Sequence, residues 1–267
     1  MVCSPIHFFN FPVKVVFHDA PYQHHDYLDF PKDVDVIVGA SGLHYQSWLR
    51  KLELIRKRKT SGKWIAWALG HNAHIKKNVK SISYPDYFSN MDLIGVRDYG
   101  TQYPWCPDPT CLSTEFDKPG KLKHKIVIYE HPRFNMPVKD NFPKFDNTKP
   151  FDEIIKFLKS AEIILTNTYH GVYWSILLKK HVIGFPFSSK FYGLKHKIPL
   201  CRDENWKPLL KKTFIYPKAL EECRKINMDF AAKVSEVLNM EITPKKKVTF
   251  PTHGGTDKFF TTACSDK

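Results

Sequence analysis

Glu162-Ile-Ile-Leu-Thr-Asn-Thr-Tyr-His-Gly-Val-Tyr-Trp-Ser-Ile-Leu-Leu-Lys179 and, close behind it, Val182-Ile-Gly-Phe-Pro-Phe-Ser-Ser-Lys190 both contain an apolar run that ends in small polar residues. In the first segment, the pair His170-Gly171 opens an amphipathic helix. Strand-to-helix junctions of this kind meet at the carboxyl edge of an open α/β sheet, where ligands bind and free helix-start amides attract anions. We therefore predict that a phosphorylated donor binds at these junctions.

Short apolar strands alternate with helical patterns along the rest of the chain. This alternation is typical of an α/β fold with mostly parallel, doubly wound sheets. Strands are predicted at residues 13–17, 34–38, 64–69, 91–96, 125–129 and 163–165, and helices at residues 45–59, from residue 151 onward, and at residues 220–238.

The pattern divides the chain into two Rossmann-like halves and a tail. Residues 1–118 are predicted to form an N-terminal, acceptor-side domain, and residues 119–240 a C-terminal, donor-binding domain. From residue 241 the pattern fades into basic and glycine-rich sequence, so residues 241–267 are predicted to form a flexible basic tail.

The composition is that of a basic globular protein. The 267 residues are 42% hydrophobic, and 41 Lys and Arg against 27 Asp and Glu give a formal net charge of +14. Such a charge favours anionic ligands, including nucleotides, acidic glycans and nucleic acids. A noncatalytic nucleic-acid-binding protein is therefore one hypothesis, but Lys and Arg are spread through both halves and no known nucleic-acid motif is present. We therefore expect no nucleic-acid partner.

The six cysteines give neither a dense disulfide framework nor paired metal-binding units. Cys106 and Cys111 leave a bridge or a metal site as a minor alternative to two small buried thiols. We expect a reducing, cytoplasmic compartment and no metal.

Residues 1–17 lack a basic leader, and no apolar run approaches the roughly 20 residues of a membrane span. Peripheral membrane contact remains compatible with the basic charge.

Two short segments resemble cofactor-binding or metal-binding motifs. Residues 39–42, Gly-Ala-Ser-Gly, lack the lysine of a P-loop and the third glycine of a dinucleotide fingerprint. Asp33-Val-Asp35 resembles an acidic metal-binding triplet, but it begins a predicted strand instead of ending one. We therefore expect no cofactor.

Several motifs in order resemble the polysaccharide pyruvyl transferase family. They are Gly95-Val-Arg-Asp98, then Pro107-Asp-Pro109, then Thr166-Asn-Thr-Tyr-His-Gly171, and finally Pro186-Phe-Ser-Ser-Lys190. The resemblance spans roughly residues 35 to 200, and the order of the motifs is more specific than any one of them. It implies a GT-B-like pair of facing Rossmann-like domains, with donor and acceptor meeting in the cleft between them and no metal required.

The resemblance has one departure at the centre of the site. Pyruvyl transferases of the family typically carry Arg-Leu-His where this chain has Thr168-Tyr169-His170. In the family pattern the histidine protonates the enol carbon of phosphoenolpyruvate, and the arginine grips its carboxylate or phosphate. Threonine cannot replace a fork of charged donors. Arg97, Lys190 or Lys195 would have to compensate.

A nucleotide-sugar donor fits the altered motif better, so the leading hypothesis is a GT-B-like glycosyltransferase that moves a sugar from a UDP-, GDP- or CMP-linked donor to a glycan acceptor. A pyruvyl transferase that forms a pyruvate ketal on a glycan is the alternative. Under the leading hypothesis, backbone amides, hydroxyls and cations hold the pyrophosphate. The predicted donor-binding residues are Arg97, Thr166, Asn167, Thr168, Tyr169, Gly171, Ser188, Ser189 and Lys190.

The predicted catalytic residues are His44, Asp98 and His170. His44 is the leading base because it follows a glycine turn at a strand end, and histidine exchanges protons near neutral pH. Purely structural roles stay open for each: a helix-start histidine at 44, a buried Arg-Asp pair at 97–98, and a buried histidine bonded to a carbonyl at 170. The acceptor side of the cleft is predicted to include Gly42, His71 and Asn72.

Overall fold

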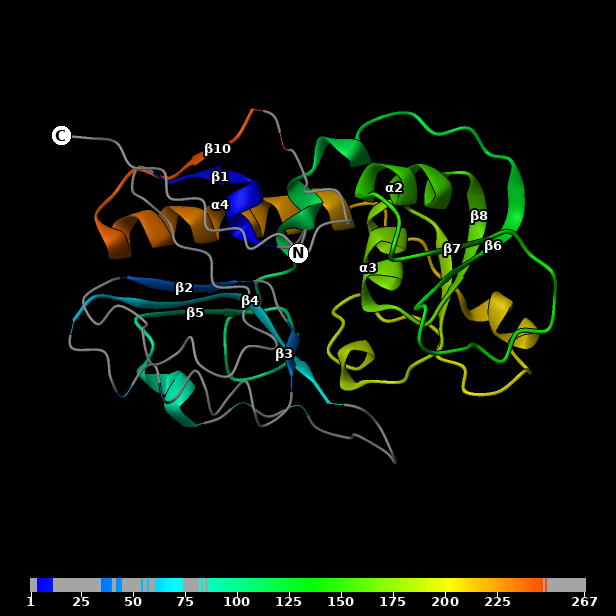
Figure 1. The fold of residues 1–267 in the computed structure, drawn as a ribbon, viewed down its shortest axis with the longest axis horizontal. Helices are drawn as coiled ribbons and strands as arrows, with labels where there is room; N and C mark the ends of the chain where they lie inside the picture. The colour runs from blue at the N-terminus through cyan, green and yellow to red at the C-terminus, as the bar shows by residue number, and fades with distance from the viewer. Residues whose placement is uncertain are drawn as a thin grey trace.

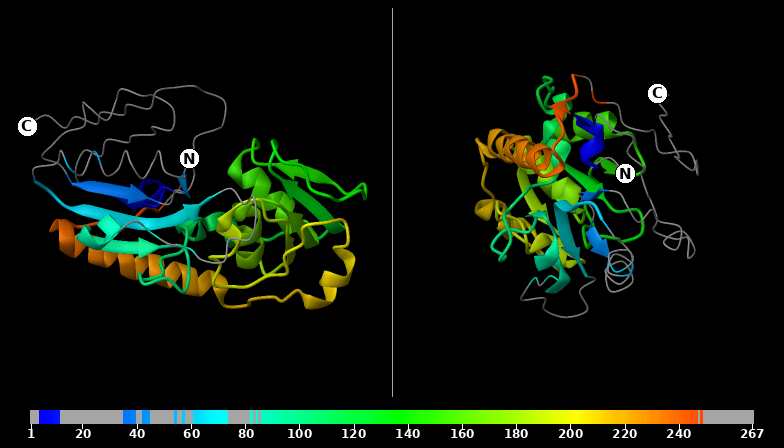
Figure 2. Two further views of the ribbon diagram at one scale, coloured as in Figure 1. Left: turned by 90° about the horizontal axis from the view of Figure 1, so that it is seen from below. Right: turned by 90° about the vertical axis from the view of Figure 1, so that its left-hand side faces the viewer.

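The structure, a computed structural model, describes residues 4–11, 35–39, 42–44, 54, 57, 61–73, 82, 84, 86–246 and 248. These residues form two four-stranded parallel sheets and a two-stranded antiparallel pair. The two parallel sheets lie side by side, and a long helix extends along the first toward the second (Figures 1 and 2). The predicted α/β class with mostly parallel sheets is therefore confirmed. The GT-B-like facing of two domains stays a prediction.

The first sheet is built around one long central strand, β4 (Trp64–Asn72). It pairs in parallel with β2 (Val36–Gly39), β3 (Gly42–His44) and β5 (Leu93–Val96). Residues 64–70 are all buried, which is the continuous apolar pattern of a parallel strand covered on both faces. The strand is longer than the predicted 64–69, and it carries its polar residues His71 and Asn72 at the carboxyl end.

The second sheet has the strand order β7-β6-β8-β9, all parallel. Its strands are β6 (His124–Glu130), β7 (Lys144–Asp146), β8 (Ala161–Thr166) and β9 (His181–Gly184). The two central strands match the predicted apolar runs, because both are rich in Ile, Val and Leu and bury most of these side chains.

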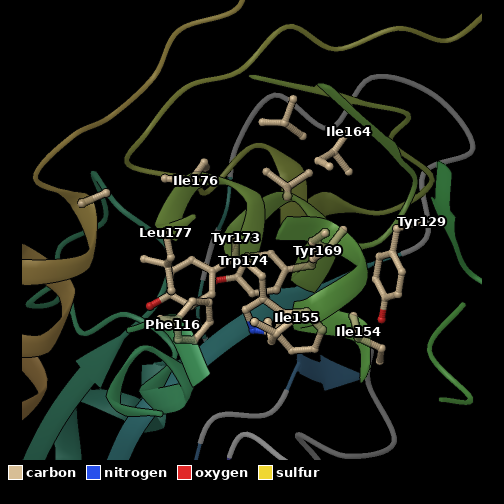
Figure 3. Packing of buried hydrophobic residues seen from close by; sticks show 14 of the residues in the cluster. Phe116, Tyr129, Ile154, Ile155, Ile164, Tyr169, Tyr173, Trp174, Ile176 and Leu177 are labelled. Carbon is tan, nitrogen blue, oxygen red and sulfur yellow. The ribbon is translucent and has the colours of Figure 1, made fainter. Parts of the chain in front are cut away.

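Two helices cover this sheet. Helix α2 (Phe151–Lys159) follows Pro150, carries acidic residues in its first turn and lysines in its last, and so complements the helix dipole at both ends. Helix α3 (Tyr169–Leu177) buries every residue except His170. Figure 3 shows its aromatic side chains packed with Phe116 and Ile155 in one hydrophobic cluster. The prediction that this helix is amphipathic is wrong, because α3 is apolar all round and lies in a core. The partly exposed His170 is the exception.

Helix α4 (Ala219–Leu238) joins the two cores. Ala219 and Cys223 belong to the cluster around α3, whereas Phe230 and Val234 pack against the first sheet. Its last residue is followed by Asn239 in the left-handed conformation, with φ of 48°. The helix matches the predicted range of 220–238, but it spans both halves instead of belonging wholly to the second.

The ends of the described chain meet beside the first sheet. β1 (Phe9–Asn10) pairs antiparallel with β10 (Thr243–Pro244), and Ile242 is buried. The start of the predicted tail at residue 241 is thus paired with the amino-terminal segment. Residues 249–267, the predicted strand at 13–17 and the predicted helix at 45–59, except Leu54 and Lys57, lie outside the described residues.

Short 3-10 helices complete the described fold. They are η1 (Pro5–His7), η2 (Asp86–Asn90), η3 (Pro109–Leu112), η4 (Thr114–Phe116), η5 (Ser189–Phe191) and η6 (Lys207–Lys212).

Two further observations concern the cysteines and the membrane. Cys106 and Cys111 are free, buried thiols. No helix among the described residues is long and apolar enough to cross a membrane.

Candidate active site

The polar residues between β8 and α3 build the start of the helix. Thr168 caps α3, because its Oγ1 accepts a hydrogen bond of 2.8 Å from the backbone N–H of Gly171. Thr166 Oγ1 accepts from the Thr168 N–H at 3.1 Å. A Cβ at Gly171 would lie 2.2 Å from the Thr166 hydroxyl, so only glycine fits there. The hydroxyls of these two threonines, both predicted to bind the donor, therefore accept hydrogen bonds that shape the turn.

Asn167 holds a neighbouring loop in place. Its side-chain oxygen accepts from the His131 N–H at 2.7 Å, and its amide donates to the Phe134 carbonyl at 2.5 Å. The residue is 2% exposed. The side chain therefore positions the segment after β6, and its predicted role of contacting the donor stays untested.

His170 faces a buried carboxylate from the first half of the chain. Its Nε2 lies 3.2 Å from Asp108 Oδ2, and its ring stacks on Trp174 with centroids 4.8 Å apart. The Asp108 side chain is fully buried, whereas that of His170 is 30% exposed. The carboxylate thus fixes the orientation of an imidazole that still reaches solvent, which is the arrangement of an acid-base group with its orienting partner.

Asp108 itself is held rigidly and docks the two halves together. Its Oδ1 accepts from the backbone N–H and the hydroxyl of Thr110, at 3.0 and 2.7 Å. Tyr173 donates its hydroxyl proton to the Asp108 carbonyl, and Trp174 Nε1 donates to Thr110 Oγ1. Asp108 was not among the predicted catalytic residues, although it is the acid of the Pro107-Asp-Pro109 motif.

Arg97 is a buried cation with unused donors. It is 4% exposed, and its guanidinium carbon lies 4.3 Å from the ring centroid of Tyr169. Its Nε and Nη2 have no hydrogen-bond partner among the described residues. A Cβ at Gly70 would come within 1.8 Å of Nε, so the glycine makes room for the side chain. The guanidinium therefore occupies a prepared place in which part of its hydrogen-bonding capacity is unmet.

The charge on Arg97 is favoured by its neighbours. Burial alone would lower the pKa of this guanidinium, but Tyr169, Asp98 and Asp108 act on it electrostatically, and the net direction is a raised pKa. The group is therefore always charged. A permanent buried cation next to the start of α3 is suited to binding an anion.

Asp98 organises the carboxyl end of the first sheet. Its Oδ2 accepts from the His71 backbone N–H at 2.6 Å and from the Tyr84 hydroxyl at 2.5 Å. A Cβ at Gly193 would lie 2.0 Å from Asp98 Oδ1, and Tyr99 donates its N–H to the Gly193 carbonyl. These contacts place Asp98 against the segment that follows η5. A structural role in joining the halves is visible, and its predicted catalytic role stays a prediction.

Ser189 and His71 form a direct bridge between the two strand-end regions. Ser189 Oγ lies 2.7 Å from His71 Nδ1 and accepts from the Ala73 N–H, while the Ser189 N–H donates to the Ala73 carbonyl. Burial lowers the pKa of His71, with Asp98 opposing this shift and Arg97 reinforcing it. His71 is therefore a neutral partner of Ser189 at neutral pH.

The remaining predicted residues lie at the same edges. Gly42 pairs with Gly70 and His44 with Asn72, so these backbones are adjacent at the end of the first sheet. The side chain of His44 lies outside what the structure describes, and its assignment as the base stays a prediction. Within the second half, Ser188 has a buried Oγ without a hydrogen-bond partner among the described residues, and Lys190 lies in η5.

The structure therefore brings most of the predicted residues to one junction. His71 contacts Ser189 through its ring and Asp98 through its backbone N–H. Arg97, the neighbour of Asp98, lies over the ring of Tyr169. His170, the neighbour of Tyr169, contacts Asp108. No group of three or more metal-ligating side chains lies together in the described part of the chain. The functional groups at this junction are the buried guanidinium of Arg97 and the oriented imidazole of His170.

The model of one protein family, polysaccharide pyruvyl transferase, matches residues 5–189, which is more than half of the chain. The chain belongs to the polysaccharide pyruvyl transferase family. This membership makes it an enzyme of the transferase class. No curated protein and no solved structure matches the chain significantly. The family supports the pyruvyl-transfer alternative of the sequence analysis and gives no support to the nucleotide-sugar hypothesis that was placed first.

Proposed function

We propose that this polysaccharide pyruvyl transferase family member transfers the pyruvyl group of phosphoenolpyruvate to two hydroxyls of one sugar residue in a glycan. The product is a cyclic pyruvate ketal, and inorganic phosphate is released. The two hydroxyls form bonds to C2 of the donor, and the bond from C2 to the phosphate oxygen breaks. Of the two hydroxyl protons, one ends on the new methyl group and the other on phosphate, so the reaction is balanced.

The buried guanidinium of Arg97 is the observation that carries this proposal. The family pattern places an arginine where this chain has Thr168, and the cation of Arg97 lies over the ring of the next residue, Tyr169, at 4.3 Å. Its unpartnered Nε and Nη2 match the paired oxygens of a carboxylate or phosphate. Arg97 therefore supplies the charge that the substitution at position 168 removes.

His170 is assigned as the acid that protonates C3 of the donor. Protonation makes C2 electrophilic, and the first sugar hydroxyl then adds to it. Asp108, whose Oδ2 lies 3.2 Å from Nε2, orients the imidazole. The proton of the first hydroxyl leaves with phosphate; the second hydroxyl then adds to C2, and its proton restores the acid form of the histidine.

The family match supports this donor over a nucleotide sugar. Thr166 and Thr168, which the sequence analysis assigned to a pyrophosphate, are used in the turn before α3. A donor with a small carboxylate and one phosphate needs fewer contacts than a nucleotide diphosphate. The arrangement around Arg97 offers few but strongly charged donors.

The experiment is an assay of the full chain with phosphoenolpyruvate and a panel of glycans. Phosphate release and a ketal detected by mass spectrometry are expected, and in deuterated water the product methyl group should carry deuterium. His170→Gln should lower turnover by about 10²–10⁴-fold with the fold intact by circular dichroism. Sugar transfer from a nucleotide sugar without phosphate release from phosphoenolpyruvate, or wild-type turnover in His170→Gln, would contradict the proposal.

A further inference from the structure

A cavity of about 450 Å³ lies at the carboxyl edge of the second sheet. It is formed by residues that directly follow β8 and β9, by the loop after β6, and by Cys201 and Arg202. Asn167 is the only predicted site residue that lines it among the side chains that the structure describes. The volume is in the range of small-molecule sites, about 300–1,000 Å³. Its lining includes Arg133, Phe134, Asn167, Phe185, Phe187 and Arg202.

The charged groups of the cavity are both cations. Arg133 and Arg202 line it and are exposed to solvent, and no Asp or Glu is among the residues that line it in the described part of the chain. Arg202 Nη2 donates to the Tyr192 hydroxyl at 2.7 Å, which fixes that guanidinium while leaving its other donors for a ligand. Guanidinium groups of this kind select carboxylate, sulfate or phosphate oxygens.

The apolar groups of the cavity form an aromatic wall. The rings of Phe134 and Phe187 stack with centroids 4.2 Å apart and an interplanar angle of 18°. His131 packs against both, at 5.0 and 5.6 Å. Both phenylalanines line the cavity, so aromatic surface borders it. Such surfaces suit the C–H face of a sugar ring.

The cavity is built by the same motif that presents His170. Asn167 bonds the backbone of His131 and Phe134, and so sets the position of the loop that carries Arg133. Three residues later the motif delivers His170 to Asp108. One short segment therefore fixes both the candidate catalytic histidine and the cationic, aromatic cavity.

We propose that this cavity binds an acidic sugar residue of the acceptor glycan, with Arg133 and Arg202 contacting its anionic group and the Phe134–Phe187 pair contacting its ring. The proposal rests on the proposed function, because it names the substrate class of that reaction. It assigns the glycan to the exposed cations at this edge and the small donor anion to the buried Arg97.

Calorimetric titration without phosphoenolpyruvate tests the cavity independently of catalysis. The probes are a trigalacturonate, its carboxyl-reduced neutral counterpart and inorganic phosphate. The wild-type chain should bind the trigalacturonate at least about 10-fold more tightly than the neutral trisaccharide. The double variant Arg133→Gln/Arg202→Gln should lose that preference. Phe187→Ala should weaken both trisaccharides and leave the affinity for phosphate unchanged.

A charge-matched control separates local contact from general attraction. Lys121→Gln/Lys123→Gln removes the same charge from exposed lysines that precede β6, at the opposite edge of the sheet, and should keep the wild-type affinities. Equal binding of acidic and neutral trisaccharides would overturn the proposal, as would an equal loss in both double variants. So would an affinity for phosphate that matches that of the trigalacturonate. Absence of ketal formation with retained, arginine-dependent trisaccharide binding would instead reject only the proposed function.

Discussion

The regions around Arg224 and Arg97 each place an arginine between segments far apart in the chain, but they use it in opposite ways. Arg224 donates from Nε to the Cys111 carbonyl, from Nη2 to the Ser113 carbonyl, and from Nη1 and Nη2 to the two carboxylate oxygens of Asp117. Arg97 has unpartnered Nε and Nη2 atoms although it is buried.

The difference indicates which arginine serves the fold and which serves a ligand. A buried donor without an acceptor costs about 1–3 kcal/mol, so an unligated fold gains nothing from leaving Arg97 unsatisfied. Arg224 shows that this chain can surround a guanidinium with acceptors where stability requires it. The proposed function assigns the missing acceptors of Arg97 to the carboxylate or phosphate of the donor.

Arg97→Met should cause the largest change, a loss of turnover of about 10³-fold, because a charged contact to the donor is removed from a buried place. The free energy of unfolding without ligand should stay within about 1 kcal/mol, since the gain from removing unsatisfied donors opposes the loss of a countercharge for Asp98 and Asp108. Steady-state kinetics and urea denaturation measure the two effects. Turnover within a few-fold of wild type would assign Arg97 a structural role.

Arg224→Met should show the reverse profile. The variant loses hydrogen bonds to backbone carbonyls and a bidentate pair whose Asp117 side chain is half exposed, so the unfolding free energy should fall by about 2 kcal/mol. Turnover per folded molecule should remain near wild type. If turnover instead falls as far as in Arg97→Met while stability is kept, the distinction between the two arginines is wrong.

The smallest expected effect is on the bridge between Ser189 and His71. Because burial lowers the pKa of His71 below its ordinary value of 6.5, the unfolded chain binds a proton more readily than the folded one. The corresponding stability is present above about pH 6.5 and is lost as the pH falls through the folded pKa. His71→Gln should therefore lose less stability than wild type between about pH 7.5 and about pH 5.

The control for this prediction is a second half-buried histidine, His196. Burial also lowers the pKa of His196, with Glu222 opposing the shift, so the wild-type chain should keep part of its acid sensitivity in His71→Gln. Denaturation curves at both pH values give the difference. Identical pH dependence in the two proteins would show that His71 does not titrate as the contacts indicate.

Local sequence patterns are sufficient to predict the strands and helices that surround the site. The apolar runs of β6 and β8, the start of α3 at His170-Gly171, and the helix at 219–238 all follow from short-range patterns. His170 could also be singled out, because it stands beside Gly171 at the start of the predicted helix. These features depend on neighbours within a few residues, which a single sequence displays.

The partners of the site residues depend on contacts that a single sequence does not display. Asp108 and His170 are separated by 62 residues, and their pairing requires η3 to dock on α3. The threonines of the motif look like ligands in the sequence, but the Thr168 hydroxyl caps the helix and the Thr166 hydroxyl accepts from the Thr168 N–H. Periodicity also does not reveal that the two ends of α4 pack in different hydrophobic cores. Nor does it reveal that Nε and Nη2 of Arg97 lack acceptors.

Calorimetric titration of phosphoenolpyruvate into wild type, Arg97→Met and Arg224→Met, without acceptor, tests the assignment of the donor site most directly. Wild type and Arg224→Met should bind with similar affinity, and Arg97→Met should bind at least about 100-fold more weakly. Equal affinity of Arg97→Met and wild type for phosphoenolpyruvate would contradict the assignment of the buried guanidinium as the group that holds the donor.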